Sequence, residues 1–164
     1  MTLPGYRAVN LLGLAACFVA LGFALYLQHV VGLEPCPLCI LQRVAVFGAM
    51  AVLIVAVIHN PKRFGQRVYA LLGLAGSLAG LGVAGRHVWL QYLPADQVPA
   101  CGPGLEYMLE VFPLQDVVNM VLRGSGECAV VDWTFFGFSL AELTLAVFVG
   151  LCALFLFQLL RRRA

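Results

Sequence analysis

The hydrophobic pattern of the chain consists of four long apolar stretches separated by polar connections. The stretches cover about residues 11–31, 40–58, 68–90 and 139–160. A helix of roughly 20 apolar residues spans a hydrocarbon core about 30 Å thick. The pattern therefore predicts four membrane-spanning helices. The first stretch is longer than the apolar core of a signal peptide and no small-residue cleavage site ends it, so we expect a retained span.

Composition supports the same class of protein. Of the 164 residues, 62% are hydrophobic and 11% are charged, and the mean hydropathy is +0.95. A soluble domain carries about a quarter charged residues, so this chain lacks the polar surface that water requires. We expect one all-α integral membrane domain over residues 1–164, built as a four-helix transmembrane bundle.

Charge divides the connections into two sets. The basic residues that flank the spans on one side are Arg7, Lys62, Arg63, Arg67 and Arg161–Arg163. The acidic residues lie on the other side, apart from Glu142 just inside the last span. By the positive-inside rule, both termini and a short loop over 59–67 are cytoplasmic. The outer side then holds a short loop, 32–39, and a long loop, 91–138. The basic residues sit at helix ends and form no patch, which argues against nucleic-acid binding.

The cysteines follow this division. Cys17 and Cys152 lie deep in spans, where a lone cysteine is usually a small packing residue. The other four all fall on the outer side: Cys36, Cys39, Cys101 and Cys128. Disulfides persist outside a bacterial inner membrane and not in the cytoplasm, so this asymmetry indicates exposed redox chemistry. A disulfide that merely staples the long loop is the alternative for the last two cysteines.

A C-x-x-C unit opens the second span. Pro37 suits the first turn of a helix, which places Cys36 near the N-cap, where backbone N–H groups stabilise a thiolate. Cys39 and Arg43 follow at helical spacing on the same face. Arg43 is therefore a candidate to stabilise a thiolate and to bind a ligand oxygen. A snorkelling interfacial arginine is the other interpretation.

Polar residues at the outer ends of spans one and three are further candidates. His87 either donates to a ligand carbonyl or faces water, and the sequence leaves both open. For Gln28 and His29 we expect a packing or interfacial role.

The long outer loop predicts one helix. Prolines and glycines keep the chain around Cys101 extended and accessible. Apolar residues then recur with helical period from Leu114 to Leu122, ending at the glycines of 124–126. We expect this amphipathic helix to lie on the outer leaflet, because the loop is too short to build a subdomain. The run from Ser139 to Glu142 predicts a capping box, with Glu142 as the cap acid.

The motifs in the sequence limit which classes of electron acceptor are possible. The cysteines lack a zinc-type spacing, so we expect no metal site, and the chain has no flavin, nicotinamide or haem fingerprint. A membrane quinone remains, and we expect it near Cys39, Arg43 and His87.

At these positions the chain resembles disulfide bond formation protein B, the bacterial DsbB family. The matching pieces are Gln28-His29-Val30, Pro35–Ile40 with Arg43, Arg86-His87 with Gln91-Tyr92, Cys101, and Ser125–Cys128 followed by Trp133. Pro37 within the C-x-x-C unit is a position at which members of the family differ.

The resemblance implies a role for each site residue. Cys101 would form a mixed disulfide with a periplasmic thioredoxin-fold oxidase of the DsbA type, and Cys128 would then attack Cys36. Cys39 would face ubiquinone or menaquinone, held by Arg43 with His87 lining the pocket. Such a protein reoxidises its partner and so supports protein disulfide formation.

Two other functions are compatible with parts of the sequence. One is a structural or assembly membrane protein whose outer loop is stapled by disulfides. The other is an enzyme similar to vitamin K epoxide reductase, although that family usually carries its C-x-x-C near the last span.

Overall fold

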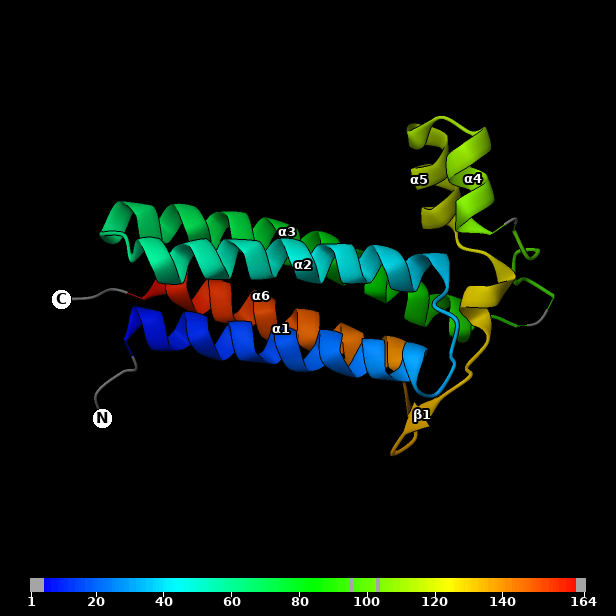
Figure 1. Ribbon diagram of the computed structural model, residues 1–164, viewed down its shortest axis with the longest axis horizontal. Helices are drawn as coiled ribbons and strands as arrows, with labels where there is room; N and C mark the ends of the chain where they lie inside the picture. Colours follow the sequence, from blue (N-terminus) through cyan, green and yellow to red (C-terminus); the bar gives the residue numbers. More distant parts are fainter. Residues whose placement is uncertain (1–4, 95, 103, 162–164) are drawn as a thin grey trace.

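Four long helices form the body of the molecule, as the computed structural model describes it for residues 5–94, 96–102 and 104–161 (Figure 1). They are α1 (Tyr6–His29), α2 (Pro37–His59), α3 (Arg63–Gln91) and α6 (Leu140–Leu160). All four are long and apolar enough to cross a membrane. The predicted all-α, four-span membrane bundle is confirmed.

Both α1 and α3 extend beyond their apolar stretches at the end rich in arginine. The helix α1 begins at Tyr6 and α3 begins at Arg63, several residues before the apolar runs at 11 and 68. Backbone hydrogen bonding continues past the hydrocarbon edge, so hydropathy alone places such ends too late. The helix α2, which lies between α1 and α3 in the sequence, ends at Asn60. This residue has the left-handed conformation, with φ of 41°.

The contact between α3 and α6 depends on glycine. A Cβ atom at Gly80 would lie 2.2 Å from the ring of Phe148, and one at Gly73 would lie 2.3 Å from the ring of Phe155. Both rings are fully buried at the centre of the bundle. Because Gly73 and Gly80 have no side chains, two aromatic rings of α6 can approach the backbone of α3.

The connection between α3 and α6 builds a small helical unit. It contains α4 (Leu105–Val111), α5 (Leu114–Arg123) and the short 3-10 helix η1 (Gly126–Ala129). These elements share one buried cluster with the N-terminal end of α2 and the C-terminal end of α3, formed by Leu38, Leu90, Met108, Val117, Val121 and Cys128. The predicted amphipathic helix is present as α5. The expectation that the loop is too short for a subdomain is wrong, because α4 supplies a second helix that packs beside α5.

A short hairpin, with two residues in each strand, precedes the last span. The sequence did not predict it. Strand β1 (Thr134–Phe135) pairs with β2 (Phe138–Ser139). The turn residues Phe136 and Gly137 both have positive φ, as a tight hairpin requires. Ser139 then caps α6, and its backbone N–H donates to the Glu142 carboxylate at 2.7 Å. The predicted capping box is confirmed.

The glycine contact yields the first prediction. Gly80→Ala should destabilise the bundle by about 1–3 kcal/mol, because the added methyl must displace Phe148. Gly76→Ala on the same helix is the matched control, since a Cβ there meets nothing within 4 Å. Unfolding of both variants by denaturing detergent in mixed micelles measures the difference. Equal stability of the two variants would contradict this account of the α3–α6 contact.

Candidate active site

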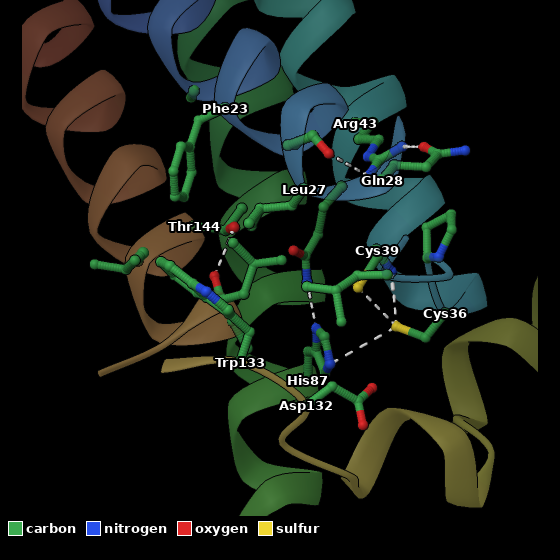
Figure 2. A pocket seen from close by; sticks show the side chains of 18 of the residues that line it. Phe23, Leu27, Gln28, Cys36, Cys39, Arg43, His87, Asp132, Trp133 and Thr144 are labelled. Atoms are coloured by element: carbon green, nitrogen blue, oxygen red, sulfur yellow. Dashed lines mark hydrogen bonds between the residues drawn. The ribbon is translucent and has the colours of Figure 1, made fainter. Parts of the chain in front are cut away.

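The N-terminus of α2 holds the first cysteine pair. Cys36 is the N-cap residue, and its sulfur accepts a hydrogen bond from the backbone N–H of Cys39 at 3.2 Å. The two sulfur atoms lie 2.8 Å apart, so the pair can close a disulfide with little movement (Figure 2). Pro37 occupies the first helical position, as the sequence predicts. The helix therefore presents both sulfurs at the positive end of its dipole.

Cys128 lies beside this pair although it belongs to the long loop. Its side chain is 1% exposed and interacts with the sulfur of Cys36. The hydrogen bond that Cys36 donates lowers the pKa of Cys128 to about 6, with further help from backbone N–H groups. The same contact raises the pKa of Cys36. The contact therefore favours the thiolate form of Cys128 and the protonated form of Cys36.

Cys101 lies on the exposed side of the same loop. The carbonyl of Ala100 accepts a hydrogen bond from the backbone of Gly126 at 3.4 Å. A Cβ atom at Gly126 would lie 3.1 Å from the Cys101 sulfur and 2.9 Å from the Pro99 carbonyl. Glycine at 126 thus lets the Cys101 segment pass directly over η1, which carries Cys128. Among Cys36, Cys39, Cys101 and Cys128, only Cys101 is exposed.

His87 points into the bundle and not into water. Its side chain is 4% exposed. One ring nitrogen, Nε2, lies 3.7 Å from the Cys36 sulfur, and Nδ1 lies 3.1 Å from the side-chain nitrogen of Gln42. Of the two interpretations of His87, the water-facing one is therefore excluded. Gln42 was not predicted, although a polar residue one turn beyond Cys39 in an apolar span was a usable signal.

Arg43 reaches towards α1. Its guanidinium donates hydrogen bonds to the side chain of Gln28 and to the carbonyl of Ala24, the latter at 3.2 Å (Figure 2). These bonds hold the cation inside the bundle, whereas a snorkelling arginine would point to the headgroups. Gln28 is therefore a hydrogen-bond partner of Arg43. From the sequence, only a packing or interfacial role was expected for Gln28.

A cavity of about 510 Å³ opens between these residues and α6. Its walls come mainly from apolar side chains of α1 and α6, and Trp133 also lines it (Figure 2). Its polar lining residues include the three carboxylate residues Glu34, Glu127 and Asp132, together with Gln28, Cys36, Cys39, Gln42, Arg43, His87 and Gln91. A cavity of this size and polarity suits a ring-bearing, lipid-soluble ligand with polar oxygens.

The cluster could also hold a metal ion. One ligand atom each from Cys36, Cys39 and His87 lies within 4.8 Å of the others. Two thiolates and an imidazole are ligands for a thiophilic ion such as Zn²⁺. Such binding requires reduced cysteines, so it would compete with disulfide formation at the same sulfurs.

Fold and site together define a class: a multi-pass membrane protein with thiol groups gathered at one end of its helical bundle. Residues 6–158 match the family described as "Disulfide bond formation protein DsbB". Among curated relatives, the chain is 54% identical to disulfide bond formation protein B of Nitrosococcus oceani, over 93% of this chain and 90% of that protein. It is 55% identical to the protein of the same name from Hahella chejuensis, over 89% and 91%.

The chain belongs to the DsbB family of disulfide bond formation proteins. It is accordingly an oxidoreductase of disulfide bond formation.

The Cys36–Cys128 contact generates a pH prediction. In a reduced variant that keeps only these two cysteines, Cys128 should ionise with a midpoint near pH 6, against an ordinary value of about 9. The ultraviolet absorbance of the thiolate measures this titration. Replacing Cys36 with Ala removes the hydrogen-bond donor, so the midpoint should rise. A midpoint that is the same with and without Cys36 would show that this contact does not set the pKa.

Proposed function

We propose that this protein is a thiol:quinone oxidoreductase of the bacterial inner membrane that reoxidises a periplasmic thioredoxin-fold oxidase of the DsbA type. Both termini lie in the cytoplasm and the cysteine end faces the periplasm, in keeping with the positions of the arginines. The observation that carries the proposal is the succession of sulfurs from exposed Cys101, past buried Cys128, to Cys36 and Cys39 beside an apolar cavity.

The exchange with the protein substrate begins at the exposed cysteine. A thiolate of the reduced partner attacks Cys101 of a Cys101–Cys128 disulfide, and Cys128 leaves as a thiolate. Its lowered pKa makes Cys128 a good leaving group and keeps it ionised. Cys128 then attacks Cys36 in the Cys36–Cys39 disulfide, and Cys39 leaves as a thiolate.

Two further exchanges return the loop to its oxidised state. The second thiol of the partner attacks the partner's own sulfur in the mixed disulfide. This step forms the partner's disulfide and releases Cys101 as a thiolate. Cys101 attacks Cys128 in the Cys36–Cys128 bond and releases Cys36. In sum, the partner dithiol becomes a disulfide and the Cys36–Cys39 pair becomes a dithiol.

The residues around the cavity fit ubiquinone or menaquinone as the acceptor. A quinone supplies a sink for the two electrons and two protons of the Cys36–Cys39 dithiol. Arg43 provides a fixed positive charge beside the cavity, where negative charge develops on an acceptor oxygen. His87 lies 3.7 Å from Cys36, within reach to pass a proton. The apolar walls of α1 and α6 exclude water from the ring.

A purely structural loop staple accounts less well for this arrangement. A staple needs one pair of cysteines, whereas here Cys128 contacts the cysteine of a second pair. Thiol trapping separates the two functions, because a staple gives fixed pairs and a relay gives pairs that shift with redox conditions.

Quinone reduction tests the proposal directly. The purified protein in nanodiscs, supplied with a reduced thioredoxin-fold partner and a soluble ubiquinone analogue, should reduce the quinone. Cys36→Ser and Cys39→Ser should each lower the rate at least a hundredfold, because each breaks the Cys36–Cys39 dithiol beside the cavity. Cys17→Ala and Cys152→Ala are controls in the spans and should retain activity. Activity that survives loss of Cys36 or Cys39 would refute the proposal.

The tight passage of the Cys101 segment over η1 gives a separate prediction. Gly126→Ala should slow oxidation of the protein partner about tenfold, because the methyl pushes Pro99 and Cys101 away from Cys128. Gly104→Ala in the same loop is the control, since a Cβ there meets nothing within 4 Å. Stopped-flow oxidation of the reduced partner measures the rate. An unchanged rate in Gly126→Ala would mean that this approach is not needed for exchange.

A further inference from the structure

A short aromatic hairpin stands apart from the rest of the cysteine end. Strands β1 and β2 and their turn project from the side of the bundle opposite to α4 and α5 (Figure 1). Positions 133–141 carry no charged side chain. Phe136, in the turn, is 88% exposed, and Phe135 and Phe138 in the strands are exposed as well. The hairpin therefore presents several aromatic rings outward from the molecule.

The turn holds a phenylalanine where the backbone disfavours one. Phe136 has φ of 51° and the next residue, Gly137, has φ of 87°. Two positive φ values in a two-residue turn favour Asn or Gly, whereas a bulky side chain in this conformation is strained. The Phe136 ring thus does not serve the conformation of its own turn. Such a local cost points to a role for the ring outside the turn.

The hairpin lies at the level where the spans leave the hydrocarbon. Strand β2 ends at Ser139, and the span α6 begins at the next residue. On α1, Phe23 comes six residues before the end of the helix, which is about 9 Å along the helix axis. The Phe23 ring contacts Trp133, with 5.3 Å between the ring centroids. Trp133 therefore lies on the membrane side of the end of α1, at a depth where aromatic side chains accumulate.

Ring contacts connect the turn to the wall of the large cavity. Phe136 packs edge-on against Phe135, with 4.5 Å between the centroids. Phe135 in turn stacks on Trp133, with 5.9 Å between the centroids and 10° between the ring planes. Trp133 and Phe23 both line the cavity (Figure 2). Because the rings are in direct contact, the position of the turn constrains the position of the cavity wall.

We infer that this hairpin inserts into the lipid leaflet at the cysteine end and thereby anchors the part of the cavity wall formed by Trp133. Lipid is the favoured occupant because the exposed rings continue the lipid-facing surface of α1 and α6, where Val19 and Val149 are also exposed. The uncharged hairpin offers few polar groups for the rim of an interface with a soluble protein. The effect on the cavity rests on the proposed quinone reaction, whereas the insertion does not.

Quenching of tryptophan fluorescence by lipids brominated on their acyl chains measures the insertion. The full chain is placed in vesicles of phosphatidylcholine and phosphatidylglycerol, with and without bromine. Phe136→Trp should add emission to that of Trp89 and Trp133, and brominated lipid should remove most of the added part. Gln97→Trp is the matched control, because Gln97 is exposed in the connection that extends past the ends of the spans (Figure 1). Its added emission should persist.

Phe136→Asn tests the effect on the cavity. Asn suits the left-handed conformation, so the hairpin should fold at least as well while the lipid-facing ring is lost. In nanodiscs, the apparent KM for the soluble ubiquinone analogue should rise about fivefold with kcat nearly unchanged, as expected when binding alone is weakened. Tyr107→Gln removes an exposed ring from α4 and should leave both constants unchanged.

Different results would overturn the two parts of this proposal. Emission of Phe136→Trp that brominated lipid leaves unquenched would overturn the insertion. A blue shift of that emission on addition of the thioredoxin-fold partner would then make the hairpin a protein-docking surface. Quenching in Phe136→Trp with a normal KM in Phe136→Asn would overturn the link to the cavity. Absence of quinone reduction even in the unaltered chain would refute the proposed function alone, and the quenching result would still decide the insertion.

Discussion

The rest of the candidate active site is arranged around one atom, the sulfur of Cys36. This sulfur caps α2 by accepting the Cys39 N–H, and it lies against the sulfurs of Cys39 and Cys128 and within 3.7 Å of His87. Through it, α2, α3 and the long loop meet at one point. The cap fixes its position, because a helix N-terminus without an acceptor leaves buried N–H groups unpaired.

Much of this arrangement follows from local sequence. Hydropathy predicts the four spans, Pro37 predicts that Cys36 is the N-cap, and periodicity predicts α5. The contacts between distant segments could not be predicted in the same way. Nothing in the spacing of the cysteines indicates that Cys128 lies against Cys36, and the resemblance to a known family supplied that connection. The helix α4 has only seven residues, too few for a clear period.

The partners of the polar residues were also outside the reach of local pattern. Gln28 binds Arg43 from another helix, and Gln42 binds His87 from another. Arg86, at the end of α3, donates to the Arg123 carbonyl at 2.8 Å and lies 4.2 Å from the ring of Trp89. It thereby ties the end of α5 to the bundle. Such pairs depend on how the helices rotate about their axes, which the packing of the whole bundle sets.

The burial of Cys128 also bears on which reductants the protein tolerates. Its thiolate would be among the most reactive groups in the molecule, yet Cys128 is almost completely buried in the cluster that it shares with residues of α2, α3, α4 and α5. Free low-molecular-weight thiols therefore reach the exposed Cys101 far more readily than Cys128. In the proposed relay, the burial of Cys128 limits its direct reduction by small thiols, so that electrons reach it through Cys101.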